Sequence, residues 1–148
     1  MIKNKVNNIV ANHIISDLVS RIRNRALSPN NNVFEVIYSK DTINILDLLA
    51  EDGFLTWHLS STPCRITKSG LKTRPIIVVK LNVDSSGKVL LHTIHIISKP
   101  GKRIYSGWKS LLQLTKDHYA LIRTSSGIFT LTKSIELKIG GEILLTYK

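Results

Sequence analysis

The hydrophobic positions of this chain change their period several times, and each change marks the boundary of a predicted element. Over residues 5–26, apolar side chains recur every three or four positions, the spacing of one face of an α-helix. Ser28 and Pro29 end that pattern, so an amphipathic helix is predicted, followed by a loop. The first 25 residues are also basic and almost free of acid, as in a transit peptide. The apolar stripe favours a helix of the mature protein instead.

A second helix is predicted between strands. The β-branched and aromatic run at residues 33–38 is typical of a strand. Ser39 is suited to cap the helix that follows, and Gly53 is suited to end it in the left-handed conformation. Two further strands are predicted over residues 54–59 and 75–83. The polar and basic stretch between them is predicted to be a mobile loop.

Shorter elements are predicted in the rest of the chain, after a turn at residues 84–87. A short helix is predicted after Trp108, and Thr132 is suited to cap a last helix that ends at Gly140. The predicted strands cover residues 89–98, 119–123, 128–131 and 143–147.

The order of these elements predicts an α+β fold of two small domains. Residues 1–84 would form a helix-strand-helix-strand-strand domain, and residues 85–148 a mainly β domain with short helices. With 148 residues, 43% of them hydrophobic, the chain can build a core of this size. A disordered basic tail is therefore excluded.

The charge is strongly positive and unevenly distributed. The formal net charge is +11, from 21 Lys and Arg against 10 Asp and Glu. Residues 35–52 are acidic, with five acidic and one basic residue, whereas the segments on both sides are basic. A positive folded surface attracts polyanions. Nucleic acid is the first candidate partner, and an anionic membrane surface is a weaker alternative.

The residues give no sign of catalysis, so we expect no enzyme, no cofactor, no metal site and no small-molecule substrate. No glycine pattern of a phosphate-binding loop is present. Cys64, the single cysteine, excludes an internal disulfide framework and a Cys-rich zinc site. His92 and His95 are three apart in a predicted strand, which points them to opposite faces. No apolar run approaches the roughly 18 residues that a membrane span needs, and we expect no membrane partner.

Two loops have the chemistry of RNA contact. Residues 99–103 combine a stiff proline, a permissive glycine and three cations, which suits contact with phosphates. Residues 123–127 offer hydroxyl and backbone N–H groups suited to the shallow minor groove of RNA. A plain hairpin turn is the alternative for the second loop. Arg21 and Arg23 are weaker candidates, because cations late in a helix also stabilise its dipole.

Five segments have a familiar sequence, and they are residues 16–24, 39–54, 97–105, 124–127 and 140–143. Together and in this order they resemble the family of the bacterial-type eighth small-subunit ribosomal protein, and the resemblance covers about residues 12–148. Two positions depart from the family pattern: the turn usually begins with a serine, where this chain has Arg123, and usually has a long residue at the position of Ser126.

The resemblance implies a structural, non-catalytic protein of the small ribosomal subunit. Such a protein binds the central domain of small-subunit ribosomal RNA directly, helps the subunit assemble and lies beside neighbouring small-subunit proteins. A free basic protein that regulates an mRNA is the alternative. The 20 Ile, 10 Asn and 14 Lys suggest an AT-rich gene and hence an organellar, mitochondrial ribosome, with a plastid or the bacterial cytoplasm as alternatives.

Chemistry and resemblance together predict one set of RNA-binding residues. They are Arg21, Arg23, Lys40, Lys99, Pro100, Gly101, Lys102, Arg103, Tyr105, Arg123, Thr124, Ser125, Ser126, Gly127, Gly140, Gly141 and Glu142.

Overall fold

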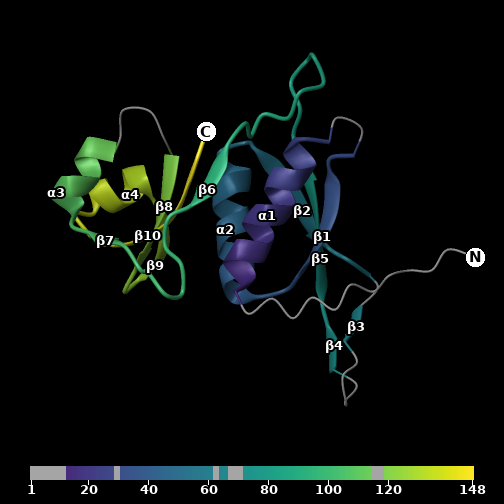
Figure 1. The fold of residues 1–148 in the computed structure, drawn as a ribbon, viewed down its shortest axis with the longest axis horizontal. Coiled ribbons are helices and arrows are strands. Elements are labelled where there is room, and N and C mark those ends of the chain that lie inside the picture. The colour runs from purple at the N-terminus through teal and green to yellow at the C-terminus, as the bar shows by residue number, and fades with distance from the viewer. Residues whose placement is uncertain (1–12, 29–30, 62–63, 67–71, 115–118) are drawn as a thin grey trace, which may run out of the picture.

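Helices and antiparallel sheets are both present in the computed structural model, which describes residues 13–28, 31–61, 64–66, 72–114 and 119–148. The helical elements are α1 (Ile14–Ala26), α2 (Lys40–Glu51), α3 (Trp108–Leu111), the 3-10 turn η1 (Leu112–Leu114) and α4 (Leu131–Glu136). The strands up to residue 84 are β1 (Val33–Ile37), β2 (Leu55–Leu59), β3 (Cys64–Ile66), β4 (Lys72–Arg74) and β5 (Ile76–Leu81). The later strands are β6 (Ile94–Ile96), β7 (Tyr105–Ser106), β8 (Tyr119–Thr124), β9 (Gly127–Thr130) and β10 (Gly141–Tyr147). The predicted α+β class is confirmed (Figure 1).

The first half of the chain, up to residue 84, contains a three-stranded antiparallel sheet in the order β1-β5-β2. This first sheet carries α1 and α2 on one face (Figure 1). Strand alternation turns every second side chain toward the helices. Phe34 pairs with Val79 and Val36 pairs with Ile77, and all four side chains are buried. The helices complete this core with apolar residues three or four positions apart. These residues are Ile15, Leu18, Val19 and Ile22 of α1 and Ile45, Leu46 and Leu49 of α2.

The start of α1 corrects the predicted helix. α1 begins at Ile14, because the backbone of His13 is extended, with φ of −140° and ψ of 97°. The His13 ring accepts the N–H of Ser16 at 3.1 Å, which satisfies one of the free donors of the first turn. Residues 5–12 of the predicted helix lie outside the described residues.

The two ends of α2 are as predicted. The Ser39 hydroxyl accepts the N–H of Thr42 at 3.0 Å and caps the helix. Gly53 follows the last turn with a φ of 81°, and Phe54 then donates its N–H to the Leu49 carbonyl. This Schellman arrangement satisfies carbonyls of the last turn and directs the chain into β2.

The second half of the chain forms an antiparallel sheet in the order β6-β10-β8-β9, and β7 pairs with the start of β10. A bulge interrupts β10: Ile143 pairs with Ile122, whereas Leu145, two residues later, pairs with Leu121, one residue earlier. The extra residue turns Ile143 and Leu145 to opposite faces of this second sheet. One face packs under α3 and α4, and the other joins the core of the first half.

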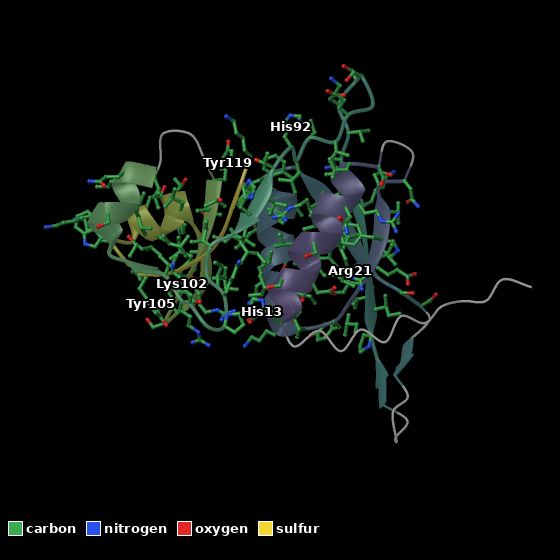
Figure 2. The ribbon with its side chains drawn as sticks, in the orientation of Figure 1. His13, Arg21, His92, Lys102, Tyr105 and Tyr119 are labelled. Atoms are coloured by element: carbon green, nitrogen blue, oxygen red, sulfur yellow. The ribbon has the colours of Figure 1, made fainter. Side chains whose placement is uncertain are left out.

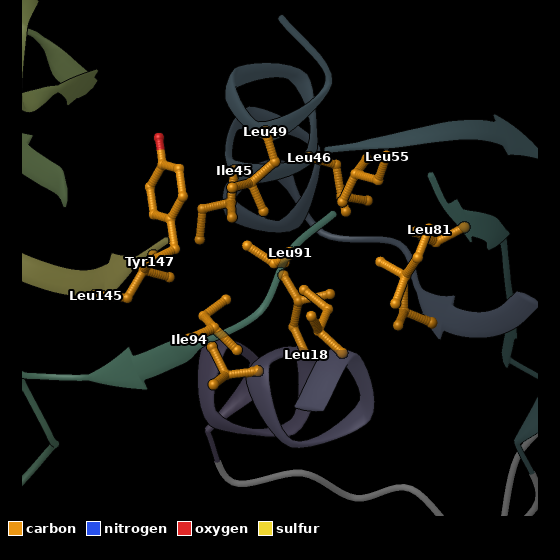
Figure 3. Packing of buried hydrophobic residues seen from close by; sticks show 14 of the residues in the cluster. Leu18, Ile45, Leu46, Leu49, Leu55, Leu81, Leu91, Ile94, Leu145 and Tyr147 are labelled. Carbon is orange, nitrogen blue, oxygen red and sulfur yellow. The ribbon is translucent and has the colours of Figure 1, made fainter. Parts of the chain in front are cut away.

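One continuous cluster of buried side chains contains residues from both sides of residue 84 (Figure 3). Ile94, Leu145 and Tyr147 of the second half pack with α1, α2 and the first sheet in this cluster. The Tyr147 hydroxyl also donates to Asp52 at the end of α2, at 2.6 Å. The division into two domains at this residue stays a prediction.

Two predictions before residue 100 were wrong. The predicted loop at residues 60–74 contains β3 and β4, which pair antiparallel, because Ile66 and Thr73 are β-branched and suit a strand despite the basic composition. The strand predicted over residues 89–98 is limited to β6. Ahead of it, the N–H groups of residues 92 and 93 both donate to the carbonyl oxygen of Lys148.

The caps of α4 also differ from the prediction. Thr130 caps the helix in place of Thr132, because it is the last residue of β9 and its hydroxyl accepts the N–H of Lys133 at 3.3 Å. Lys138, with a φ of 55°, is the left-handed residue that follows α4, so this helix ends ahead of Gly140.

Candidate nucleic-acid interface

The connection between β8 and β9 is a tight turn that carries two exposed serines, Ser125 and Ser126. The Thr124 hydroxyl donates to the Gly127 carbonyl at 2.9 Å and accepts the N–H of Ser126 at 3.2 Å. Gly127 has a φ of 131°, which L side chains rarely adopt. Within the described part of the chain, neither serine hydroxyl has an intramolecular partner. This hydroxyl turn (residues 124–127) therefore presents two hydroxyls on a backbone that Thr124 and Gly127 hold.

Arg123, directly before the hydroxyl turn, is directed toward the first half of the chain. Its NH2 group donates to the Asp41 carboxylate at 2.6 Å. The two side chains are 35% and 50% exposed, so solvent screens the pair, and such pairs contribute about 0–1 kcal/mol. The contact shows that the start of the hydroxyl turn lies next to the first turn of α2.

Gly140 and Gly141 lie where backbones approach closely. A Cβ at Gly141 would lie 2.2 Å from the Arg123 carbonyl oxygen, and one at Gly140 would lie 2.5 Å from a carbonyl oxygen of β7. Both glycines therefore have a steric role in the second sheet. Glu142 is buried and pairs with Tyr105 on one side and Arg123 on the other. Contact of Gly140, Gly141 and Glu142 with RNA stays a prediction.

The basic segment before β7 is a closed hairpin. Lys99 and Lys102 exchange backbone hydrogen bonds of 3.0 and 2.9 Å around the Pro-Gly pair. At its base, the buried Ser98 hydroxyl accepts the N–H of Ile104 at 3.0 Å. All side chains of residues 99–103 are exposed. This basic hairpin (residues 99–103) therefore holds its three cations toward solvent on a preformed backbone.

Strand register brings the hydroxyl turn and the basic hairpin to one end of the second sheet. Glu142 pairs with both Tyr105 and Arg123, so β7, β10 and β8 are neighbours at this end. Tyr105 is 67% exposed there, and Figure 2 labels it and Lys102 in the same part of the view. Lys40 is exposed in the first turn of α2, which Arg123 contacts. We call this region the basic end of the second sheet.

Arg21 and Arg23 are held in other contacts. Arg21 donates to the Asp17 carboxylate at 2.9 Å and to the Glu35 carbonyl at 3.2 Å, and it lies apart from Lys102 in Figure 2. Arg23 donates to the Ile94 carbonyl at 2.9 Å, which joins α1 to β6. These contacts give both arginines a structural role, and their contact with RNA stays a prediction.

The described residues also bear on metal binding and on membrane insertion. No group of three or more His, Cys, Asp or Glu side chains there could hold a metal ion. None of the helices found in those ranges is long and apolar enough to cross a membrane. His92 lies ahead of β6 and not within it, so the predicted strand alternation does not apply to His92 and His95.

Sequence reasoning missed two residues that shape the basic end. Asp41 holds Arg123 across 82 positions, and no local pattern in the sequence pairs them. Ser98 fixes the base of the basic hairpin, and only its place within the resembling segment 97–105 could have drawn attention to it.

Comparison with known proteins decides the family. A family model described as ribosomal protein S8 matches residues 13–147, which is nearly the whole chain. The chain belongs to the ribosomal protein S8 family. The resemblance carried by the five sequence segments is thereby confirmed.

Relatives from different organisms match over almost their full length. The small ribosomal subunit protein uS8 of Sulfurimonas denitrificans is 29% identical over 137 residues, which cover 91% of this chain and 97% of that protein. The small ribosomal subunit protein uS8c of Euglena gracilis is 35% identical over 134 residues, covering 88% of this chain and 94% of that protein. The uS8c protein of Phaeodactylum tricornutum is 32% identical over 136 residues, with 91% and 97% covered.

Proposed function

We propose that this chain is a structural component of the small ribosomal subunit and binds small-subunit ribosomal RNA directly through the basic end of the second sheet. Membership of the ribosomal protein S8 family supports the place in the subunit. The observation that carries the binding site is the pairing of Glu142 with both Tyr105 and Arg123, which brings the basic hairpin and the hydroxyl turn together.

The two loops would contribute different interactions with RNA. Lys99, Lys102 and Arg103 are exposed cations that would contact phosphates without reading the sequence. Ser125 and Ser126 can exchange hydrogen bonds with 2′-hydroxyls and base edges in the shallow minor groove, or with unpaired bases. A rigid backbone under both loops lowers the entropy that binding would cost.

In this proposal the protein acts by holding an RNA fold and catalyses no reaction. A protein that binds only the folded form of the central domain stabilises that form by mass action, which would assist assembly of the subunit. Neighbouring small-subunit proteins would then join the stabilised RNA. The excess of Ile, Asn and Lys supports a ribosome of an organelle, and we propose the mitochondrion.

Sedimentation of the native protein tests the place in the subunit. We expect the protein to sediment with small subunits through a high-salt wash and to be released when the RNA is digested. Recovery as free protein before digestion would contradict the proposal and favour the regulator of an mRNA. Sedimentation of subunits purified from separated organelles tests the compartment.

Binding to isolated RNA tests the site. A transcript of the central domain should bind more tightly than a random duplex of equal length at one salt concentration. The Lys99→Ala, Lys102→Ala, Arg103→Ala triple variant should lose affinity for both. Lys80→Ala, an exposed cation on β5, is the control and should bind as the unaltered protein does.

A further inference from the structure

An open groove of about 540 Å³ lies between the end of α1 and the segment that leads into β6. Its lining includes Arg23 and Leu27 on the α1 side and Lys88 and His92 on the other. His92 donates its N–H to the carbonyl of Lys148, so the groove lies at the end of β10 opposite to the basic end. β10 has seven residues, which separates its two ends by about 20 Å.

The walls of this groove are fixed by hydrogen bonds. Arg23 ties α1 to the Ile94 carbonyl at 2.9 Å. On the other wall, the Asp84 carboxylate accepts the N–H groups of Ser86 and Lys88 at 2.8 and 3.0 Å. The pKa of Asp84 is held below its usual value, mainly by the hydrogen bond from the Ser86 side chain and further by the bonds from the backbone. The Asp84 carboxylate therefore stays charged at neutral pH and keeps the hydrogen bonds that shape this turn. A groove with such walls is preformed.

The groove combines an aliphatic surface with a positive rim. Leu27 is 79% exposed and lines the groove together with Val89 and Leu91, both of which are buried in the main core. Arg23 and Lys88 supply permanent positive charge, and no acidic side chain is among the described residues that line the groove. The end of α1 carries a partial negative charge of about half a unit, and the Asp84 carboxylate beside Lys88 adds one negative charge, so Arg23 and Lys88 leave a small net positive charge on the rim.

We propose that this groove docks an acidic peptide segment of a neighbouring small-subunit protein. An aliphatic side chain of that segment lies between Leu27 and Val89, and its carboxylates lie beside Lys88 and Arg23. The proposal rests on the proposed function, because the partner is a protein of the same subunit. Apolar burial supplies affinity at such a site, and the opposite charges orient the segment.

Two other occupants fit the groove less well. The positive rim would attract RNA, but the described lining contains no Phe, Tyr or Trp, and only the exposed His92 and His95 offer rings on which a base could stack. The proposed RNA site also lies at the opposite end of β10. The chain's own residues 1–12 contain Lys3 and Lys5 and no acid, so the positive rim repels them.

Photocross-linking in intact small subunits tests the proposal. The variant Leu27→p-benzoylphenylalanine places the reactive group on an exposed side chain, where it should not disturb folding. Leu137→p-benzoylphenylalanine, at an exposed position that follows α4, is the matched control. Cross-linked products from purified subunits are identified by mass spectrometry after separate digestion of RNA and protein. We expect a cross-link from position 27 to an acidic, leucine- or isoleucine-containing peptide of another protein, and none to that peptide from position 137.

Charge reversal adds a second readout. Lys88→Glu in the same background should lower the yield of that cross-link roughly fivefold, the effect of a surface charge worth about 1 kcal/mol. Lys80→Glu makes the same charge change on β5, away from the groove, and should leave the yield unchanged. Circular dichroism of both variants controls for folding.

Different outcomes would contradict the groove proposal alone and the proposed function as well. A cross-link from position 27 to RNA, to residues 1–12 of the same chain, or to nothing in subunits that contain the protein overturns the groove proposal and leaves the proposed function intact. An equal loss of yield with Lys80→Glu overturns it as well. Absence of the unaltered protein from small subunits overturns both proposals.

Discussion

Arg123 of β8 donates to the carboxylate of Asp41 in the first turn of α2, at 2.6 Å and across 82 positions of the chain. The contact joins the hydroxyl turn of the second sheet to a helix of the first half.

Removing the charge of Asp41 should weaken this contact without unfolding the protein. We expect Asp41→Asn and Arg123→Gln each to lower the free energy of unfolding by at most about 1 kcal/mol, because both side chains are partly exposed. A double-mutant cycle in urea at low salt measures the coupling. A coupling energy of zero would show that the pair contributes nothing to stability.

The close approach at Gly141 predicts a large effect of a single methyl group. Gly141→Ala should destabilise the fold by about 1–3 kcal/mol, because its Cβ would lie 2.2 Å from the Arg123 carbonyl oxygen and backbones must shift. Gly101→Ala is the control, since no atom lies within 4 Å of its Cβ position. Equal midpoints of urea unfolding for the two variants would contradict this steric role.

Substitutions in the hydroxyl turn distinguish a role in RNA contact from a role in the structure of the turn. Ser125→Ala should leave the fold intact and cost roughly 0.5–1.5 kcal/mol of affinity for the central-domain transcript, the net value of one hydrogen bond. Gly127→Val should do worse, because valine is strained at a φ of 131°. The affinities for the transcript and for a random duplex are compared at fixed salt, with circular dichroism as the folding control. An equal loss on both RNAs would reduce the turn to a generic phosphate contact.

The basic hairpin predicts a change in salt dependence. The Lys99→Ala, Lys102→Ala, Arg103→Ala triple variant should lower the slope of log affinity against log salt by about 0.7–0.9 for each phosphate that the variant no longer neutralises. The slope is measured on the central-domain transcript over a series of salt concentrations, with Lys80→Ala as the single-charge control. An unchanged slope in the triple variant would show that the hairpin does not contact phosphates.

The buried hydroxyl of Tyr147 leads us to expect that the free energy of unfolding falls at alkaline pH. Burial is the main cause that raises the pKa of its hydroxyl well above the usual value of 10.0, and the hydrogen bond to Asp52 raises it further. The folded protein therefore keeps a proton that the unfolded chain releases above pH 10. Stability is fully present below pH 10 and falls as the pH rises above it. The slope of unfolding free energy against pH in this range, measured by urea unfolding, should be shallower for Tyr147→Phe, and an identical slope would contradict the assignment.

Several features were determined by the sequence alone because they depend on neighbours within a few residues. Ser39 and Gly53 mark the ends of α2, since a cap bonds to the N–H three positions away and glycine alone adopts the left-handed conformation at little cost. The helical and strand periods are also local, and they indicated the α+β class. The order of the five segments indicated the family.

Local reasoning failed at both ends of α4. Thr132 and Gly140 are a plausible cap and stop for α4, but the end of β9 sets the start of that helix at Thr130 and Lys138 ends it. The hydroxyl of Thr124 bonds within the turn, to Gly127 and Ser126, and contact of Thr124 with RNA stays a prediction.

The tertiary structure alone decided how the candidate site is assembled. The sequence identified the basic hairpin and the hydroxyl turn separately, and only the pairing of β7 and β8 with β10 brings them to one end of a sheet. The bulge that turns Ile143 and Leu145 to opposite faces, and the pairing of Arg123 with Asp41, also join segments that are distant in the chain. Sequence periodicity records the environment of a residue over one or two turns of chain. It holds no measure of the distance between segments that meet only when the core closes.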